Sequence, residues 1–270
     1  MSSHRLCRRF VIAVLILGAA SGCGQLDVHS RTAGDGVASF DGLITEQSVQ
    51  RFFEQVGSRD ITKLVIDSVG GEPIAAIRLG TWLNAKGITI QIEKRCLSSC
   101  ANYVFIGARK KIVLSPGVVA WHGGAEQKNF RERDLQYAMI EEKLRLGSPL
   151  SNQERALSED AAKLADYRYS KALRPMQKSF YLSTGVSEYL TRAGQEPTYL
   201  GHLWTYDRQG LELFGVCHVE LPAGYGSEAY LRRAKDDFGV TVVALPIDDS
   251  VRSMLEAQTR ESGQRINSCP

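Results

Sequence analysis

The sequence has no apolar run long enough to cross a membrane as a helix. Its longest apolar segment, residues 10–20, has 11 residues, whereas a transmembrane helix needs about 20. An excess of one charge is also missing, because 33 Lys and Arg stand against 30 Asp and Glu. The surplus of three consists of Arg5, Arg8 and Arg9. The rest of the chain is neutral and has no basic block, so we expect no nucleic-acid partner.

Residues 1–22 have the pattern of a bacterial secretory signal peptide, with a basic start, a short apolar stretch and small residues before the cleavage site. The small residues before Cys23 also resemble a lipobox, in which the cysteine is lipidated and becomes the new first residue. Ala20 stands where the usual leucine would be, so simple signal cleavage remains an alternative. Both interpretations predict export to the periplasm, and lipidation of Cys23 would add a membrane anchor.

The composition beyond this segment favours one globular domain. Hydrophobic residues make up 43% of the chain, far above the content of a disordered protein. Residues 23–38 are polar and Gly-rich, and we interpret them as a tether. We expect an α/β domain over residues 39–250, with a helical insert at about 125–196 whose mixed charges indicate a solvated surface. Residues 251–270 are expected to form a C-terminal tail.

Short β-rich runs alternate with helical patterns through the first half of this domain. Such an alternation requires right-handed crossovers and predicts a mainly parallel sheet. Within the insert, Pro175 is expected to separate two helices. Strands are predicted at residues 61–66, 88–93, 111–114, 118–121 and 240–245, and helices at 48–56, 72–87, 99–108, 130–146, 161–174, 176–183 and 227–238.

Four cysteines remain after Cys7 is assigned to the signal peptide and Cys23 to the lipid anchor. They are Cys96, Cys100, Cys217 and Cys269. An even number in an oxidising compartment permits disulfides, although three pairings exist and the sequence does not choose among them. Four reduced thiols are an alternative. A zinc site that adds His218 is disfavoured, because two ligands adjacent in sequence fit a tetrahedron poorly.

Three strand ends carry the residues that acyl transfer requires. Gly70 and Gly71 follow one strand, where backbone N–H groups can approach a ligand without obstruction. Ser98 and Ser99 open the next helix, and His122 ends a later strand. A serine, a histidine and a glycine pair can act as nucleophile, general base and oxyanion hole. Taken singly, each has a simpler interpretation as a helix cap, a structural histidine or a turn.

The order and spacing of these residues resemble the ClpP/crotonase superfamily, and within it secreted bacterial proteins similar to the proteolytic subunit of the Clp protease. Residues 67–72 resemble the family's Ser-Pro-Gly-Gly segment, with Val69 in place of proline. Ser98 matches the nucleophile, since Gly107 follows it by nine residues and His122 by 24. The resemblance implies a spiral of β-β-α units with a mainly parallel sheet and a helical insert.

The resemblance also implies a serine hydrolase, in particular a peptidase that works without ATP. Ser98 would be the nucleophile and His122 its general base. The N–H groups of Gly70 and Ser99 would hold the oxyanion, with Gly71 permitting close approach. No metal or other cofactor is expected. The expected partner is a peptide or an unfolded protein, bound as an added strand, and the chain is a candidate homo-oligomer.

The third catalytic residue of the family has no counterpart in the sequence. The matching stretch lacks an Asp at the aligned place, and Asp207 is better placed to cap the next helix. A main-chain carbonyl, an acid from the insert or no group at all would then orient His122. The alternative function is an inactive envelope lipoprotein of the same fold, a scaffold or binding module in which Ser98 is a cap and His122 is structural.

Overall fold

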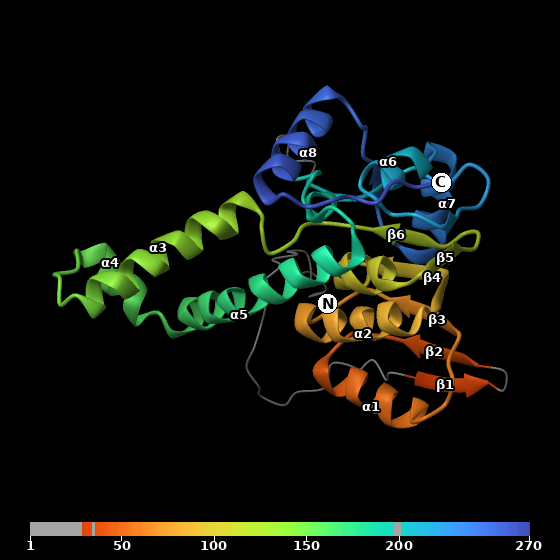
Figure 1. The fold of residues 1–270 in the computed structure, drawn as a ribbon, viewed down its shortest axis with the longest axis horizontal. Coiled ribbons are helices and arrows are strands. Elements are labelled where there is room, and N and C mark those ends of the chain that lie inside the picture. The colour runs from red at the N-terminus through yellow and green to blue at the C-terminus, as the bar shows by residue number, and fades with distance from the viewer. Residues whose placement is uncertain (1–28, 34–35, 197–200) are drawn as a thin grey trace, which may run out of the picture.

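A computed structural model of the chain describes residues 29–33, 36–196 and 201–270, so the predicted signal peptide and Cys23 lie outside the described residues. A seven-stranded sheet has the order β1-β2-β3-β4-β5-β8, with β6 paired to β4, and β7 and β9 form a second sheet (Figure 1). All pairs are parallel except β1 with β2. The predicted α/β class with a mainly parallel sheet is confirmed. The strands are β1 (His29–Ala33), β2 (Val37–Asp41), β3 (Lys63–Ser68), β4 (Thr89–Leu97), β5 (Lys110–Val113), β6 (Val118–Ala120), β7 (Leu203–Thr205), β8 (Val219–Glu220) and β9 (Val242–Ala244).

Helices pack on this sheet and also extend away from it (Figure 1). The side chains of β3 are alternately buried and half-buried, as expected for a strand that contributes one face to a core. None of the helices in the described ranges is both long and apolar enough to span a bilayer. The helices are α1 (Glu46–Val56), α2 (Pro73–Lys86), η1 (Cys100–Phe105), α3 (Lys128–Arg145), α4 (Asn152–Glu159), α5 (Ala161–Thr184), η2 (Glu188–Thr191), α6 (Arg208–Leu213), α7 (Glu228–Phe238) and α8 (Asp249–Ser262).

The predicted tether, residues 23–38, overlaps the folded domain, which corrects the boundary drawn from the sequence. Strand β1 and the start of β2 lie within it, and Ala33 pairs with Val37. The backbone hydrogen bonds between two strands do not require any particular pattern of side chains. A polar, Gly-rich segment at a sheet edge therefore shows little periodicity by which it could be recognised.

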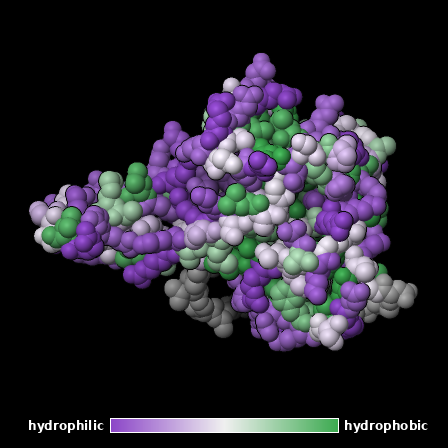
Figure 2. Space-filling model, viewed as in Figure 1, coloured by the Kyte–Doolittle hydropathy of each residue, from purple (hydrophilic) through white to green (hydrophobic). Residues whose placement is uncertain are grey.

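The insert forms a helical arm, made of α3, α4 and α5, that projects away from the sheet (Figure 1). The predicted break at Pro175 is wrong, because α5 runs without interruption through this residue. Buried side chains lie on both sides of the proline, among them Tyr167 and Phe180. Their packing stabilises the helix enough to offset the hydrogen bond that proline cannot donate. Figure 2 shows hydrophobic side chains among the polar ones on the arm, and the exposed ones include Leu135, Met139, Leu144 and Leu146.

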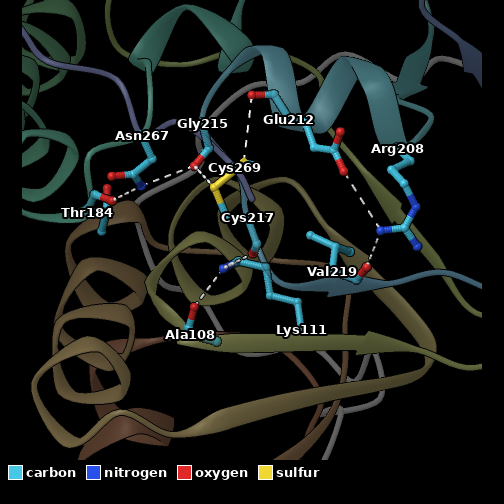
Figure 3. Close-up of a disulfide and its surroundings, with 10 residues drawn as sticks. All are labelled: Ala108, Lys111, Thr184, Arg208, Glu212, Gly215, Cys217, Val219, Asn267 and Cys269. Carbon is cyan, nitrogen blue, oxygen red and sulfur yellow. Dashed lines mark hydrogen bonds and ion pairs between the residues drawn. A yellow bond between two sulfur atoms is a disulfide. The ribbon is translucent and has the colours of Figure 1, made fainter.

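The C-terminal segment is part of the fold rather than a loose tail. Residues 249–262 form α8, which buries Val251 and Leu255 one turn apart. Beyond α8, the Asn267 amide nitrogen donates to the carbonyls of Thr184 and Gly215, as Figure 3 shows. A disulfide between Cys217 and Cys269 closes a loop of 52 residues. The end of the chain is therefore fastened to the base of the arm.

Lys111 on β5 is buried, with 4% of its surface exposed. Its ammonium donates to the carbonyl of Ala108 at 2.7 Å and reaches that of Cys217 at 3.5 Å (Figure 3). Burial lowers the pKa of this amine to about 8. The unfolded chain, in which a lysine has a pKa of about 10.4, therefore binds the proton more tightly than the folded chain does. The stability that Lys111 adds above its unfolded pKa of about 10.4 is therefore lost as the pH falls through its folded pKa of about 8.

We expect Lys111 alone to raise the free energy of unfolding by roughly 3 kcal/mol between pH 7.5 and pH 10.5, taken as the difference between the native protein and Lys111→Met, since one pKa unit is worth about 1.4 kcal/mol. Lys111→Met should lack this contribution. Urea denaturation at both pH values measures it, with Lys110→Met as control, because Lys110 lies next to it with an exposed ion pair to Glu220. Equal pH dependence in the native protein and Lys111→Met would contradict the prediction.

Candidate active site

Strand β4 determines where the site lies, because the strand that pairs with it changes part-way along its length. Its first half, from Thr89 to Ile92, pairs with β5, and its second half, from Arg95 to Leu97, pairs with β6. The pairing with β3 is also irregular near Ser68. The ends of β3, β4 and β6 thereby lie side by side, and the next residues of each strand carry the predicted site.

Ser98 and His122 are brought together at these strand ends. The Ser98 hydroxyl oxygen lies 2.6 Å from Nε2 of His122, across 24 residues of sequence. The backbone N–H of Ser98 donates to the Ala120 carbonyl at 2.9 Å. Both side chains are half-buried, so a substrate can reach them. The pair that the sequence predicts is thus assembled with hydrogen-bond geometry.

The backbone at Ser98 is in the left-handed region, with φ of +56°. This conformation costs about 1 kcal/mol or more for a residue with a side chain and is enriched at functional sites. A disulfide between Cys96 and Cys100 brackets the residue, and both cysteines are fully buried. With the other two cysteines paired to each other, no thiolate remains for the zinc site considered above. The loop that carries Ser98 is therefore covalently braced.

The alternative role of these serines, as helix caps, is not what the geometry shows. No side chain caps η1, which is a π-helix with Ser99 at its N-cap position. The Ser99 hydroxyl instead donates to the Gly71 carbonyl at 2.7 Å. This bond ties the serine loop to the glycine loop. The backbone N–H of Ser99 has no acceptor within the helix, as is general at a helix start.

The two glycines of the loop after β3 differ in their contacts. A Cβ on Gly70, where φ is +93°, would lie 2.5 Å from the Leu97 carbonyl oxygen and 2.8 Å from Cβ of Ser98, so Gly70 is the residue that permits close approach. Its N–H donates to the Ser68 hydroxyl at 3.1 Å. The N–H of Gly71 has no hydrogen-bond acceptor within the described ranges. Of the two glycine amides, that of Gly71 is therefore the one without a protein acceptor in this part of the structure.

His122 has no acidic partner. In the part of the chain that the structure describes, no carboxylate bonds its imidazole. Asp207 caps α6, as predicted, by accepting the N–H of Gly210 at 2.8 Å. The carboxylates of Glu188 and Glu196 both bind Arg192. Burial lowers the pKa of His122. The imidazole is therefore held neutral, which is the form that a general base requires.

Two amide side chains that the sequence did not reveal hold the backbone around His122. The Gln195 side chain donates to the His122 carbonyl at 2.6 Å, and the Asn102 side chain donates to the Gly123 carbonyl at 2.9 Å. On the other side, Trp121 and Trp204 exchange both backbone hydrogen bonds, at 2.8 and 2.9 Å. No short motif contains Gln195 or Asn102, and only their position in the fold identifies them.

Comparison with known proteins adds a likeness of fold. No family model matches the sequence, and no curated protein matches it. One similar solved structure is a mutant of the 1510-N membrane-bound stomatin-specific protease, at 13% identity, covering 78% of this chain and 97% of that chain, with a TM-score of 0.38. Another is described as an enoyl-CoA hydratase/isomerase from Mycobacterium abscessus, at 13% identity, covering 89% and 99%, with a TM-score of 0.26.

Both TM-scores are below 0.5, so the case for chemistry rests on the geometry of the site alone. One of these proteins is named a protease and the other an enoyl-CoA hydratase/isomerase.

Proposed function

We propose that this protein is an extracytoplasmic serine hydrolase, and more narrowly a peptidase that acts without ATP. The observation that carries the proposal is the 2.6 Å contact between the Ser98 hydroxyl oxygen and Nε2 of His122. The contact is made at half-buried positions and beside Gly70, whose lack of a side chain permits the close approach of the two loops. A histidine that only filled the core would have no need of a serine in a strained backbone conformation opposite it.

The reaction divides into acylation and hydrolysis. His122 accepts the hydroxyl proton as the oxygen of Ser98 attacks the substrate carbonyl carbon, and the C–N bond breaks when the histidine returns that proton to the leaving amine. The N–H groups of Gly71 and Ser99 stabilise the negative oxygen of each tetrahedral intermediate. Water then attacks the acyl-enzyme with the same histidine as base, which releases the acid and restores Ser98.

The two disulfides are compatible with an oxidising compartment, and the signal-like residues 1–22 support export. ATP-driven unfolding is not available outside the cytoplasm. The substrates proposed are therefore short peptides or unfolded proteins, which can add as a strand beside the glycine loop.

A non-catalytic scaffold with the same fold is the second candidate. The observation in its favour is that His122 lacks a carboxylate partner among the described residues, whereas the family places an acid there. This candidate predicts an unreactive Ser98.

A fluorophosphonate probe separates the two candidates. We expect the purified mature protein to be labelled on Ser98, because the neutral imidazole of His122 is placed to remove the hydroxyl proton. Mass spectrometry of the labelled peptide locates the adduct. Ser98→Ala should abolish labelling, whereas Ser250→Ala should leave it intact, because Ser250 lies on the surface at the start of α8 and bonds only Asp248. Absence of the Ser98 adduct, under conditions that label a known serine hydrolase, would overturn the peptidase proposal.

A further inference from the structure

The side chain of Ser99 joins the two loops that form the candidate site. Its hydroxyl donates to the Gly71 carbonyl oxygen at 2.7 Å, across 28 residues of sequence, and the residue is 4% exposed. A serine at a helix start ordinarily accepts a backbone N–H of that helix. Ser99 stands at the N-cap position of η1 without capping it. Its hydroxyl binds the glycine loop instead.

The main chain of Gly71 is fixed from the opposite side by Ile44. The Ile44 N–H donates to the Gly70 carbonyl, and the Glu72 N–H donates to the Ile44 carbonyl, both at 2.8 Å. The C=O and N–H bonds of a trans peptide group point in opposite directions, so the N–H and the C=O of Gly71 both point away from Ile44. Because the Ser99 hydroxyl binds this carbonyl, the Gly71 N–H lies on the side that faces the serine loop.

We propose that Ser99 is a positioning residue, whose hydroxyl holds the peptide groups of Gly71 so that the Gly71 N–H and the Ser99 N–H point to the same oxygen of the substrate. The inference rests on the proposed hydrolase function for its catalytic meaning. An oxyanion hole is effective only when its donors are in place before the reaction begins. The Ser99 hydroxyl itself touches no reacting atom and acts through the amide of Gly71.

Ser99 can act in this way because its own backbone is held in place. The N–H of the preceding residue, Ser98, donates to the Ala120 carbonyl at 2.9 Å. The disulfide between Cys96 and Cys100 closes the loop around both serines. A short side chain on a fixed backbone loses little entropy when it binds.

The glycine loop has no side chain of its own that could hold its peptide groups. Gly70 and Gly71 have φ of +93° and +143°, and glycine has more conformational freedom than any other residue. A Cβ on Gly70 would lie 2.9 Å from the Ser99 backbone nitrogen, and one on Gly71 would lie 2.1 Å from the Ile44 carbonyl oxygen. The loop is thus closely packed at both glycines, and the Ser99 hydrogen bond restricts the rotation that glycine would otherwise permit.

Ser99→Ala tests the inference, because it removes the hydroxyl and keeps the backbone N–H. The Gly71 carbonyl can be observed by itself, since Gly71–Glu72 is the only Gly-Glu step in the sequence. Protein labelled with 13C at glycine carbonyls and 15N at glutamate gives a single HNCO signal. We expect this signal to move upfield in Ser99→Ala, because loss of a hydrogen bond shields a carbonyl carbon. Ser99→Thr keeps the hydroxyl and should leave the signal near its native position.

The kinetic readout is the hydrolysis of a chromogenic ester. We expect kcat of Ser99→Ala to fall about tenfold with KM unchanged, since complete loss of an oxyanion donor costs about 10²-fold or more and a displaced donor should cost less. Ser99→Thr should restore most of the rate. Ser183→Ala is the matched control, because Ser183 also donates to a main-chain carbonyl, that of Phe180 at 2.8 Å, but does so on α5.

An unmoved Gly71 carbonyl signal in Ser99→Ala overturns the inference, and so does an unchanged kcat in the folded variant. A Ser99→Thr protein with the native carbonyl signal but the rate of Ser99→Ala would contradict it as well. If Ser98 is not labelled by the fluorophosphonate and no variant hydrolyses the ester, the hydrolase proposal fails. The NMR signal then still decides whether the Ser99 hydroxyl holds the Gly71 carbonyl.

Discussion

His122→Ala is expected to lower kcat/KM for ester or peptide hydrolysis by about 10⁴-fold, because removal of the base leaves the Ser98 hydroxyl with its proton. The oxyanion N–H groups and the substrate contacts survive the change, so a slow residual reaction should persist. Initial rates with a chromogenic ester measure the effect. His202→Ala is the matched control, since His202 is exposed. Equal rates in His122→Ala and the native protein would show that this histidine takes no part in the reaction.

The role of His122 as general base also predicts how kcat/KM depends on pH, and burial of the imidazole sets the direction of the effect. Burial lowers the pKa of His122 below its ordinary value of about 6.5. The neutral form that accepts the proton therefore persists to lower pH than in a free histidine. We expect kcat/KM to be independent of pH near neutrality and to decline only as the pH falls through this lowered value. An acid limb above pH 6.5 would contradict the assignment of His122 as the base.

Gly107→Ala is expected to destabilise the fold by about 3 kcal/mol or more, which is the range of severe overpacking. A Cβ at Gly107 would lie 2.2 Å from the carbonyl oxygen of Gly80 on α2. Gly80 is equally crowded, because its own added Cβ would lie 2.3 Å from the Tyr103 carbonyl oxygen on η1. The obstacles are main-chain atoms, which cannot rotate away, so α2 and η1 would have to separate.

Urea denaturation with the midpoint and slope fitted together measures the loss at Gly107. Gly147→Ala serves as the control, since an added Cβ there meets nothing within 4 Å and only its left-handed φ of +66° is strained, a cost of about 1 kcal/mol. If Gly107→Ala lowers the free energy of unfolding no more than Gly147→Ala does, α2 and η1 can separate without a cost in stability. Because η1 begins two residues after Ser98, reduced probe labelling should accompany the lost stability.

Gly107 also shows that a spacing can be noticed before its physical reason is known. Its distance of nine residues from Ser98 favours Ser98 over Ser99 as the candidate nucleophile. The structure supplies a physical reason for a glycine there, the close crossing with Gly80, which no local pattern encodes. Pro175 gives the opposite case, since a local rule predicted a helix break and buried side chains on both sides of the proline outweighed it.

For the cysteines, too, the sequence decided one part of the answer and the fold decided the other. Their even number permitted two disulfides, but only the positions of the chain segments select Cys96 with Cys100 and Cys217 with Cys269. The orientation of His122 was left open among a carbonyl, an acid and no group. The structure shows that Glu188 and Glu196 bind Arg192 rather than the imidazole.

The sequence by itself determined the α/β class and the order of most strands and helices, together with the residues at the strand ends that we propose for acyl transfer. These features depend on hydrophobic period, on turn residues and on spacing, all of which are local along the chain. Only the tertiary structure decided that Ser98 meets His122, which glycine amide is free, and which amide side chain holds the histidine. Those contacts join segments 24 to 73 residues apart, and a contact between distant residues depends on how the whole sheet is assembled.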